Sequence, residues 1–388
     1  MSDSGAVSDQ SAGFLGTVER IGNKLPDPAM LFVGLLFVVW LLSWALSYVS
    51  FDVIDPRSGE ALVINNLLSG SALTEFTSVM VTNFSHFHPV GVVLVAMLGI
   101  GVADATGFIN TGLRALLNVT SDRFLTPMVI AVGIVSHTAA DAGYVLVIPL
   151  GGVIFYAAGR HPVAGIAAAF AGVSGGFSAS FVPSSIDPLL QGLSQEGARI
   201  LDPAVELNPL NNYYFTTASS LLIIGVGWLV TSKIIEPRLA SVKIDGDPDN
   251  LPEMRHLESQ ERKGLRWALV AMLAGVIFLV ITALPEGSPW RDAGGQVASF
   301  QAPLMRSIVS LIFFLFLVPG IVYGVVAGTV TSSKDVIAGM TKSMNSMAYY
   351  LVIMFFIAQF VYAFGQSNLG VLLALQGASF LKALAMPA

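Results

Sequence analysis

Long stretches without a single charged residue dominate this sequence. Residues 29–51 form the first of them, and the prolines on either side of Asp27 favour a helix that begins there. A helix needs about 20 apolar residues to cross a bilayer, and inside lipid its backbone must satisfy its hydrogen bonds within the chain. Each such stretch is therefore a predicted membrane span. The others are residues 89–113, interrupted only by Asp104, 207–232, 267–285 and 307–333.

The composition supports the same fold class. Of the 388 residues, 54% are hydrophobic and only 11% are charged, against about 25% charged residues in soluble domains. We therefore expect an all-α polytopic membrane protein. The chain contains no cysteine, which excludes disulfides and thiolate-ligated metals, and its net charge of −6 does not favour binding to nucleic acid.

Charged residues divide the chain into four predicted segments. Residues 1–28 form an N-terminal segment, 29–232 a first membrane block, 233–266 a charged cytoplasmic loop, and 267–388 a second membrane block. Residues 343–381 carry no charge; they are too many for one helix and too few for two spans with a loop. We therefore expect the second block to be incomplete.

The basic residues predict the orientation of the chain in the membrane. With a cytoplasmic N-terminus, most of the 19 Lys and Arg residues lie on the cytoplasmic side, as the positive-inside rule requires. The basic residues that then lie outside are Arg57, Arg199, Arg291, Arg306 and Lys382.

The first block contains two apolar arms, residues 124–140 and 142–159, on either side of Asp141. Each arm is slightly short for a full span. The turn between them, SHTAADAG, is small and polar, and irregular backbone at membrane depth persists only where protein or a wet cavity surrounds it. We therefore expect residues 124–159 to form a re-entrant helical hairpin, although two complete short spans would return the chain to the same side.

The next apolar stretch is predicted to be a broken helix over residues 162–190. It contains GVSGGFSASFVPSSIDPLLQG, from Gly172 to Gly192, whose glycines, serines and prolines do not favour a continuous helix. A break inside a bilayer frees backbone groups, which must then bind protein, an ion or a substrate. Alternatively, the small residues only permit close helix packing, but packing does not account for Asp187 between Ile186 and Pro188.

Oxygen atoms in this broken helix predict a binding site. Asp187 supplies a charge that can also accept a proton, and hydroxyl and carbonyl oxygens are suitable ligands for a small cation. The candidate hydroxyls belong to Ser178, Ser180, Ser184 and Ser185.

The hairpin turn supplies a second group of candidates, Ser136, His137 and Asp141. His137 and Asp141 are four residues apart, so on a helix they would share a face. They could form a cation or substrate site at the tip, or they could cap the two arms of the hairpin. Both interpretations stay open. Asp104 is interpreted as a residue that snorkels or caps near the cytoplasmic end of its helix.

Enzyme functions find little support in the sequence. Nothing resembles a phosphate-binding loop, a histidine cluster for a metal or a nucleophile elbow. An intramembrane aspartyl protease would need two adjacent aspartates, and Asp104 and Asp141 have neither the expected local sequence nor equivalent depth. We therefore do not expect an enzyme and keep the protease as a remote alternative.

Several segments are similar to one known family. The hairpin turn SHTAADAGYVLVIPLGG and the broken helix GGFSASFVPSSIDPLLQG resemble the first re-entrant hairpin and following unwound helix of the AbgT family, the p-aminobenzoyl-glutamate transporters and related antimetabolite exporters. NFSHFHPVGVVLVAMLGIGVADATGFI and NPLNNYYF resemble other segments of that family. The resemblance covers most of the chain from about residue 29 onward.

The resemblance implies a homodimer in which each protomer is an inverted repeat with two hairpins and their adjoining broken helices. It places the family's acidic residue of the first broken helix on Asp187. The second hairpin has no counterpart, since the chain ends at LKALAMPA, where that hairpin would begin, so the second repeat is expected to be truncated. Ser180 stands where many members of the family have asparagine.

These observations together predict a cation-coupled secondary transporter of p-aminobenzoyl-glutamate or sulfonamide-type antimetabolites. We expect an exporter in the bacterial inner membrane that works by alternating access, with sodium or a proton as coupling ion and no cofactor. Asp187 would be the coupling acid, and the tip from Ser136 to Tyr144 would close over the site. The alternative is a sodium-coupled dicarboxylate carrier, which shares the hairpin architecture but whose Ser-Asn-Thr signature is missing from this sequence.

Overall fold

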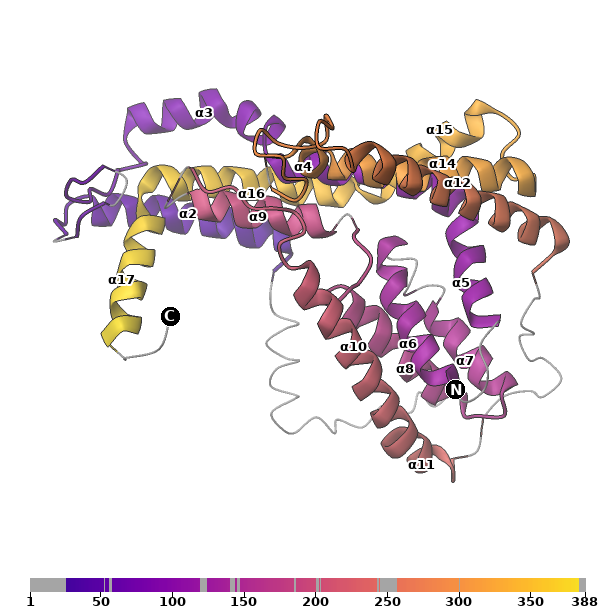
Figure 1. The fold of residues 1–388 in the computed structure, drawn as a ribbon. Helices are drawn as coiled ribbons and strands as arrows, with labels where there is room; N and C mark the ends of the chain where they lie inside the picture. Colours follow the sequence, from indigo (N-terminus) through magenta and orange to yellow (C-terminus); the bar gives the residue numbers. More distant parts are fainter. Residues whose placement is uncertain are drawn as a thin grey trace, which may run out of the picture. The chain divides into compact units, whose positions relative to one another are not determined.

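The structure of the protein is a computed structural model (Figure 1). It describes residues 26–51, 53–55, 58–118, 124–139, 144, 147–184, 186–199, 202, 204–242, 244, 257–299 and 301–383. The regular secondary structure of the described residues is helical, apart from a single isolated β-bridge between Ile54 and Ala61. The predicted all-α fold class is thus confirmed.

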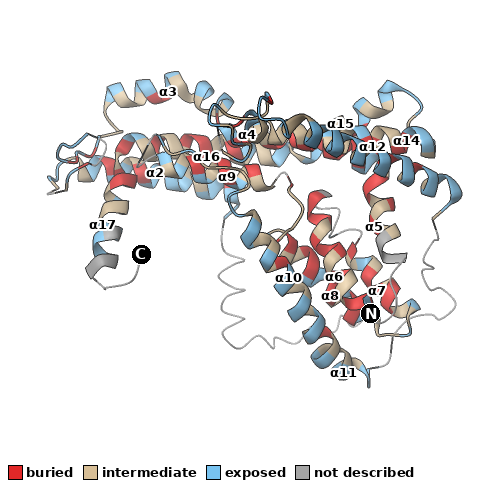
Figure 2. Ribbon diagram, in the orientation of Figure 1, coloured by how far each residue is buried: buried red, intermediate tan, exposed pale blue. Residues whose placement is uncertain are grey.

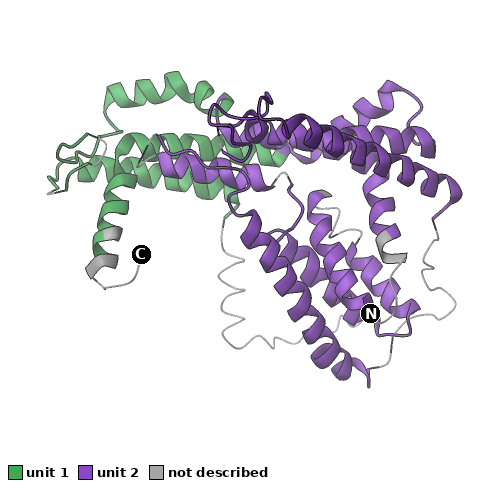
Figure 3. Cartoon of the chain, in the orientation of Figure 1, with its two compact units in different colours: residues 1–85, 349–388 green, residues 86–348 purple. Residues whose placement is uncertain are grey.

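The chain forms two compact units, which Figure 3 distinguishes by colour. One consists of Met1–Ser85 with Tyr349–Ala388, and the other of His86–Ala348. Each unit therefore combines residues from both of the predicted membrane blocks. The division into residues 1–28, 29–232, 233–266 and 267–388 stays a prediction.

The first unit contains the helices α2 (Pro28–Leu46), α3 (Gly70–Ser85), α16 (Ala348–Ser367) and α17 (Leu369–Ala383). α2 begins where the prolines predicted, because Asp27 accepts a hydrogen bond from the Ala29 amide at 2.8 Å. The core of this unit includes Leu36, Phe76 and Leu369, and the Trp40 ring meets the Phe76 ring edge-on at 5.2 Å.

The structure adds two features to what the sequence predicted for this unit. The polar segment before His88, to which the sequence assigned no structure, contains α3, in which Thr74 and Ser78 donate hydrogen bonds back to carbonyls of their own helix. The charge-free stretch 343–381 contains two helices of 20 and 15 residues. They are separated at Asn368, whose φ of 62° is left-handed and ends α16.

The second unit is a larger bundle of helices. Its members are α4 (His88–Ala105), α5 (Phe108–Asn118), α6 (Leu125–Ser136), α7 (Ile148–Ala157), α8 (Pro162–Gly176), α9 (Ile186–Arg199), α10 (Tyr213–Val230), α11 (Glu236–Leu239), α12 (Ser259–Ala283), α13 (Pro303–Arg306), α14 (Ile308–Ala327) and α15 (Ser333–Ser346). The short turns η2 (His137–Ala139) and η4 (Thr231–Ile235) follow α6 and α10. α6 and α7 pack against α8, and α4 packs against α14 and α15.

The predicted hairpin corresponds to α6 and α7, helices of 12 and 10 residues. At 1.5 Å per residue neither exceeds about 18 Å, well short of a hydrocarbon core of about 30 Å. Glycines let both arms lie close to α8: a β-carbon on Gly172 would collide with the backbone of Ile130, and one on Gly151 would lie 2.7 Å from the Gly165 carbonyl. Two short arms on a neighbouring helix are the geometry expected of a re-entrant hairpin.

Helices extend into both ends of the charged segment 233–266. At its start, η4 and α11 continue α10 to Leu239, and at its end α12 begins at Ser259 instead of at residue 267. A helix can extend beyond the apolar region when its charged residues find partners. Arg160 pairs with Glu236 at 2.6 Å, and Arg114 pairs with Glu261 at 2.7 Å.

Six helical stretches among the described residues are long and apolar enough to cross a membrane. The most apolar windows of α10 and α12 are only 11% buried within the chain, and both helices show extensive exposed surface in Figure 2. Apolar helices exposed all round are typical of lipid-facing spans. The polytopic membrane architecture is therefore confirmed.

Candidate functional site

The helix predicted to be broken is broken. α8 ends at Gly176 and α9 begins at Ile186, and the amides of Ser178 and Ala179 both donate to the Gly175 carbonyl, at 3.0 and 2.9 Å. Ser180 holds the following bend, because its Oγ donates to the Val182 carbonyl at 3.0 Å and accepts from the Val182 amide at 3.1 Å. The predicted hydroxyl at position 180 is therefore engaged with backbone.

Asp187 lies in the first turn of α9 and forms a reciprocal cap with Ser184. Its Oδ2 accepts a hydrogen bond from the Ser184 amide at 2.7 Å, while the Ser184 Oγ accepts one from the Ile186 amide at 3.2 Å. A carboxylate is favourable at this end of a helix, where free amides give a positive partial charge. Asp187 therefore has a structural role in starting α9, and any second role must be compatible with it.

A cavity of about 270 Å³ lies beside this cap. Three segments line it: the turn after α6, the break from Gly176 to Asp187, and the residues that lead into α10. It brings together five of the predicted residues, namely His137, Ser178, Ser180, Ser184 and Asp187. We call it the Asp187 cavity.

His137 comes to this cavity from the hairpin. Its side chain is buried, and its Nδ1 lies 2.6 Å from the Ile134 carbonyl oxygen. A carbonyl can only accept, so Nδ1 carries the proton and donates, which leaves Nε2 as the acceptor of the neutral ring. The tautomer that this bond fixes gives the cavity an additional acceptor.

The other hairpin candidates are placed differently. Ser136 is fully buried and donates to the Gly133 carbonyl at 2.6 Å, so it does not line the cavity. Asp141 and Ser185 lie outside the described residues. Asp104 lies in the last turn of α4 and does not line the cavity either.

One residue from the second half of the hairpin turn also approaches the break. The Tyr144 ring stacks on the Phe177 ring with centroids 5.8 Å apart and an interplanar angle of 24°. Its hydroxyl lies 3.4 Å from the Ser174 Oγ. The tip of the hairpin thus contacts the broken helix from both ends of the turn, through His137 and Tyr144.

Sequence reasoning missed the third wall of the cavity. Asn211, Asn212 and Thr216 line it, together with Gln191 from α9. The asparagines belong to the segment NPLNNYYF, to which the sequence assigned a resemblance but no role. Two adjacent amides near the start of the predicted span 207–232 are the signal that could have found them.

The cavity combines one carboxylate, one imidazole and a set of hydroxyls and amides. Such oxygens can hold a small cation, and the amides can bind a polar organic group. Within the described ranges, no group of three His, Asp or Glu side chains is arranged to hold a metal ion.

Comparisons with known proteins agree with this architecture. The family model of the AbgT transporters matches residues 13–388. The p-aminobenzoyl-glutamate transport protein of Escherichia coli (strain K12) is 35% identical over 367 residues, which are 95% of this chain and 71% of that protein.

Two solved structures are similar. The YdaH transporter of Alcanivorax borkumensis, described as having an unusual topology, superposes with a TM-score of 0.85 at 38% identity and covers 93% of this chain and 75% of that one. MtrF of Neisseria gonorrhoeae, described as illuminating a class of antimetabolite efflux pumps, gives a TM-score of 0.89 at 39% identity, with 95% of this chain and 75% of that one covered.

The relatives are named as transporters, which confirms the prediction of a transporter instead of an enzyme. The family match extends over nearly the whole chain, and the hairpin and broken helix that suggested the family are present in the structure. This chain is a member of the AbgT family of transporters.

Proposed function

We propose that the protein is a cation-coupled secondary transporter that moves a small aromatic acid of the p-aminobenzoyl-glutamate type, or a sulfonamide-type antimetabolite, by alternating access. The names of the Escherichia coli and Neisseria gonorrhoeae relatives support this choice of substrates. The observation that carries the proposal is the Asp187 cavity, where a broken helix brings a carboxylate and three serines beside the hairpin tip.

Asp187 is the coupling acid in this proposal. Its Oδ2 caps the Ser184 amide, so loss of its negative charge, by protonation or by binding a cation, weakens the bond that starts α9. Ion binding is then coupled to conformation, because a proton or cation on the Asp187 carboxylate weakens the hydrogen bond that holds the break in the helix in place. Sodium or a proton can serve as the ion.

The cavity suits an aromatic substrate with polar groups. Its volume of about 270 Å³ is close to the lower end of ligand pockets in proteins, about 300 Å³. Phe177 and Phe215 offer aromatic surface for a benzene ring, and Asn211 and Asn212 offer donors and acceptors. The Tyr144 contact on Phe177 lets the hairpin tip close over a bound ring.

Export, insertion in the bacterial inner membrane with a cytoplasmic N-terminus, and a homodimeric state complete the proposal. The antimetabolite efflux pump among the similar structures supports export, and the distribution of basic residues supports the orientation. The homodimeric state rests on the family resemblance alone. A sodium-coupled dicarboxylate carrier is the alternative, and no contact in the cavity favours it over an aromatic acid.

The test is transport in cells that lack their own exporters. Radiolabelled p-aminobenzoyl-glutamate, a radiolabelled sulfonamide and succinate are compared while sodium and pH are varied separately. We expect the aromatic substrates to be moved and Asp187→Asn to reduce their transport by about tenfold or more, because an amide carries no negative charge to hold a cation and does not take up a proton near neutral pH.

Asp104→Asn is the matched control, since Asp104 is an acid within a predicted span that does not line the cavity. Wild-type transport by well-expressed Asp187→Asn would refute the coupling role. Transport of succinate alone would favour the dicarboxylate carrier.

A further inference from the structure

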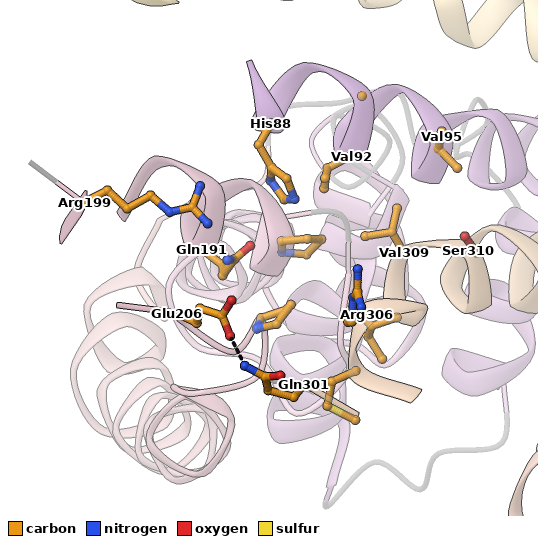
Figure 4. A pocket seen from close by; sticks show the side chains of 15 residues that line it. His88, Val92, Val95, Gln191, Arg199, Glu206, Gln301, Arg306, Val309 and Ser310 are labelled. Atoms are coloured by element: carbon orange, nitrogen blue, oxygen red, sulfur yellow. Dashed lines mark hydrogen bonds between the residues drawn. The ribbon is translucent and has the colours of Figure 1, made fainter. Parts of the chain in front are cut away.

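A second and larger cavity, of about 600 Å³, lies along the other end of α9 (Figure 4). Its walls come from the start of α4, the length of α9 from Pro188 to Arg199, the segment around Glu206, and the chain from Gln301 into α14. The charged or titratable side chains around it are His88, Arg199, Glu206 and Arg306, which Figure 4 labels. We call it the Arg306 cavity.

The charge of this cavity is opposite to that of the first. Two guanidinium groups and an imidazole face a single carboxylate, and Glu206 already accepts a hydrogen bond from the Gln301 Nε2 at 3.0 Å. Arg199 pairs with Glu196 only loosely, at 3.7 Å on an exposed helix surface, where such pairs contribute little. Within the described part of the chain the Arg306 side chain has no hydrogen bond or ion pair. Guanidinium groups are therefore available to an anion.

The two cavities share a wall. Gln191 and Pro209 line both of them, and α9, at 14 residues, is about 21 Å long. The segment beside α9 is fixed to it by two glutamines: Gln191 donates to the Leu207 carbonyl at 3.0 Å, and Gln195 accepts from the Leu207 amide at 2.6 Å. Both glutamines are buried. The residues that separate the two cavities are therefore Gln191, Pro209 and the segment held by these glutamines, and a ligand that leaves one cavity is next to the other.

A dianionic substrate has an aromatic ring and carboxylates, and these groups need different binding environments. The Asp187 cavity has a carboxylate among its lining and, among the described residues, neither arginine nor lysine. It is suited to an aromatic ring and a cation, and it repels a carboxylate until a cation or a proton neutralises Asp187. The planar fork of arginine, in contrast, matches a carboxylate with two parallel hydrogen bonds.

We propose that the Arg306 cavity is a second binding site for organic carboxylates, which holds the acidic end of the transported molecule before or after it occupies the Asp187 cavity. This inference rests on the proposed function. The volume of about 600 Å³ is within the range of sites for ligands of drug size. With the orientation predicted from the basic residues, Arg199 and Arg306 face the outside, so the site collects an imported anion or releases an exported one.

The test is equilibrium binding, which does not require transport. Purified protein in nanodiscs of zwitterionic lipid is titrated with radiolabelled p-aminobenzoyl-glutamate and with radiolabelled p-aminobenzamide, which has the ring but no carboxylate. We expect Arg306→Gln and Arg199→Gln each to weaken binding of the first about tenfold, and the double variant more, with no change for the second. Arg306→Lys should retain part of the affinity.

Controls separate this inference from the proposed function. Arg266→Gln removes one exposed positive charge from α12 and lines neither cavity, so it should bind like the wild type. Asp187→Asn should reduce transport about tenfold or more and leave carboxylate-dependent binding in place. Binding that depends on the arginines in a protein that transports none of these compounds would refute the proposed function and leave the second site standing.

Two results would overturn the inference. Unchanged binding in the double arginine variant would show that the carboxylate is recognised elsewhere. Loss of binding in nanodiscs that contain phosphatidylglycerol, at constant ionic strength, would assign the guanidinium groups to a lipid headgroup instead of a soluble anion.

Discussion

The two ends of α9 carry opposite chemistry. The first turn holds Asp187 and opens into a cavity of hydroxyls and amides, while the last turn holds Arg199 and opens into a cavity with two guanidinium groups. An acid at the amino end and a base at the carboxyl end is the arrangement that the helix dipole favours. One short helix therefore stabilises both charges, and the structural role of Asp187 as a cap is compatible with the role proposed for it in coupling.

The largest effect is expected from a substitution that distorts the Asp187 cavity by overpacking the helices beside it. Gly172→Leu places a side chain where even a β-carbon would collide with the Ile130 backbone, so α6 must move away from α8. Overpacking of this kind costs about 1–3 kcal/mol or more. We expect a clear loss of thermal stability and loss of transport, because His137 is withdrawn from the Asp187 cavity.

Gly225→Leu is the matched control, since nothing lies within 4 Å of a β-carbon on Gly225 in α10. Melting in detergent and transport are measured for both variants. If Gly172→Leu transported normally, the close crossing of α6 and α8 would not hold the cavity in shape.

A milder change tests the cap on α9. Ser184→Ala removes the hydroxyl that accepts from the Ile186 amide, and loss of a cap typically costs about 1 kcal/mol. We expect transport to fall about fivefold and Ser184→Thr to recover most of it, while binding at the Arg306 cavity stays the same. Transport rates are measured with carboxylate binding as the internal reference, which distinguishes a local loss of the cap from general unfolding. An equal loss of transport and of carboxylate binding would contradict a local role of the cap.

The sequence predicted the Asp187 side of this comparison better than the Arg306 side. The glycines, serines and prolines between Gly172 and Gly192 predict a break in the helix from local sequence alone, and Asp187 lies within the same segment. The main features of the first cavity could therefore be predicted without knowing the tertiary structure. His137 was grouped with Asp141 by spacing, and that pairing stays a prediction because Asp141 lies outside the described residues. The place of His137 in the cavity depends on the packing of the hairpin beside the broken helix, which no local pattern gives.

The Arg306 cavity had no comparable local signal. Arg199 and Arg306 end separate segments far apart along the chain, and only the packing of α9 and of α14 against α4 places them around one space. The same holds for α3, whose serines and threonines look polar in the sequence but bond to their own helix. Patterns of apolar and small residues predict helices and their breaks. Which charged residues from distant parts of the chain lie close together can be seen only in the folded structure.

Ionic strength should distinguish the two cavities. Raising choline chloride from about 10 mM to about 300 mM shortens the screening length from about 30 Å to below 10 Å. We expect binding of p-aminobenzoyl-glutamate to weaken several-fold, because exposed guanidinium groups attract the anion through water. Arg306→Gln should give a shallower salt dependence, and p-aminobenzamide should give none. A salt dependence that is identical in Arg306→Gln and the wild type would place the attraction elsewhere.

The smallest effect is expected at a site that belongs to neither cavity. The Asp335 carboxylate caps α15 and accepts hydrogen bonds from the Thr331 amide at 2.8 Å, the Thr331 hydroxyl at 2.9 Å and the Ser332 amide at 2.9 Å. These bonds, led by the one from the Thr331 amide, hold the pKa of Asp335 below its ordinary value.

A carboxyl group whose pKa is lowered by folding stabilises the folded state above its unfolded pKa, and this contribution disappears as the pH falls through the lowered value. Asp335→Asn should therefore lower the melting temperature at pH 7 by no more than about 2 °C, and the difference from the wild type should shrink below about pH 4. Melting curves across this pH range measure it. Transport and carboxylate binding should not change, since Asp335 lines neither cavity. A change in either would mean that α15 influences α9 through α4, and the two cavities could no longer be treated as depending on α9 alone.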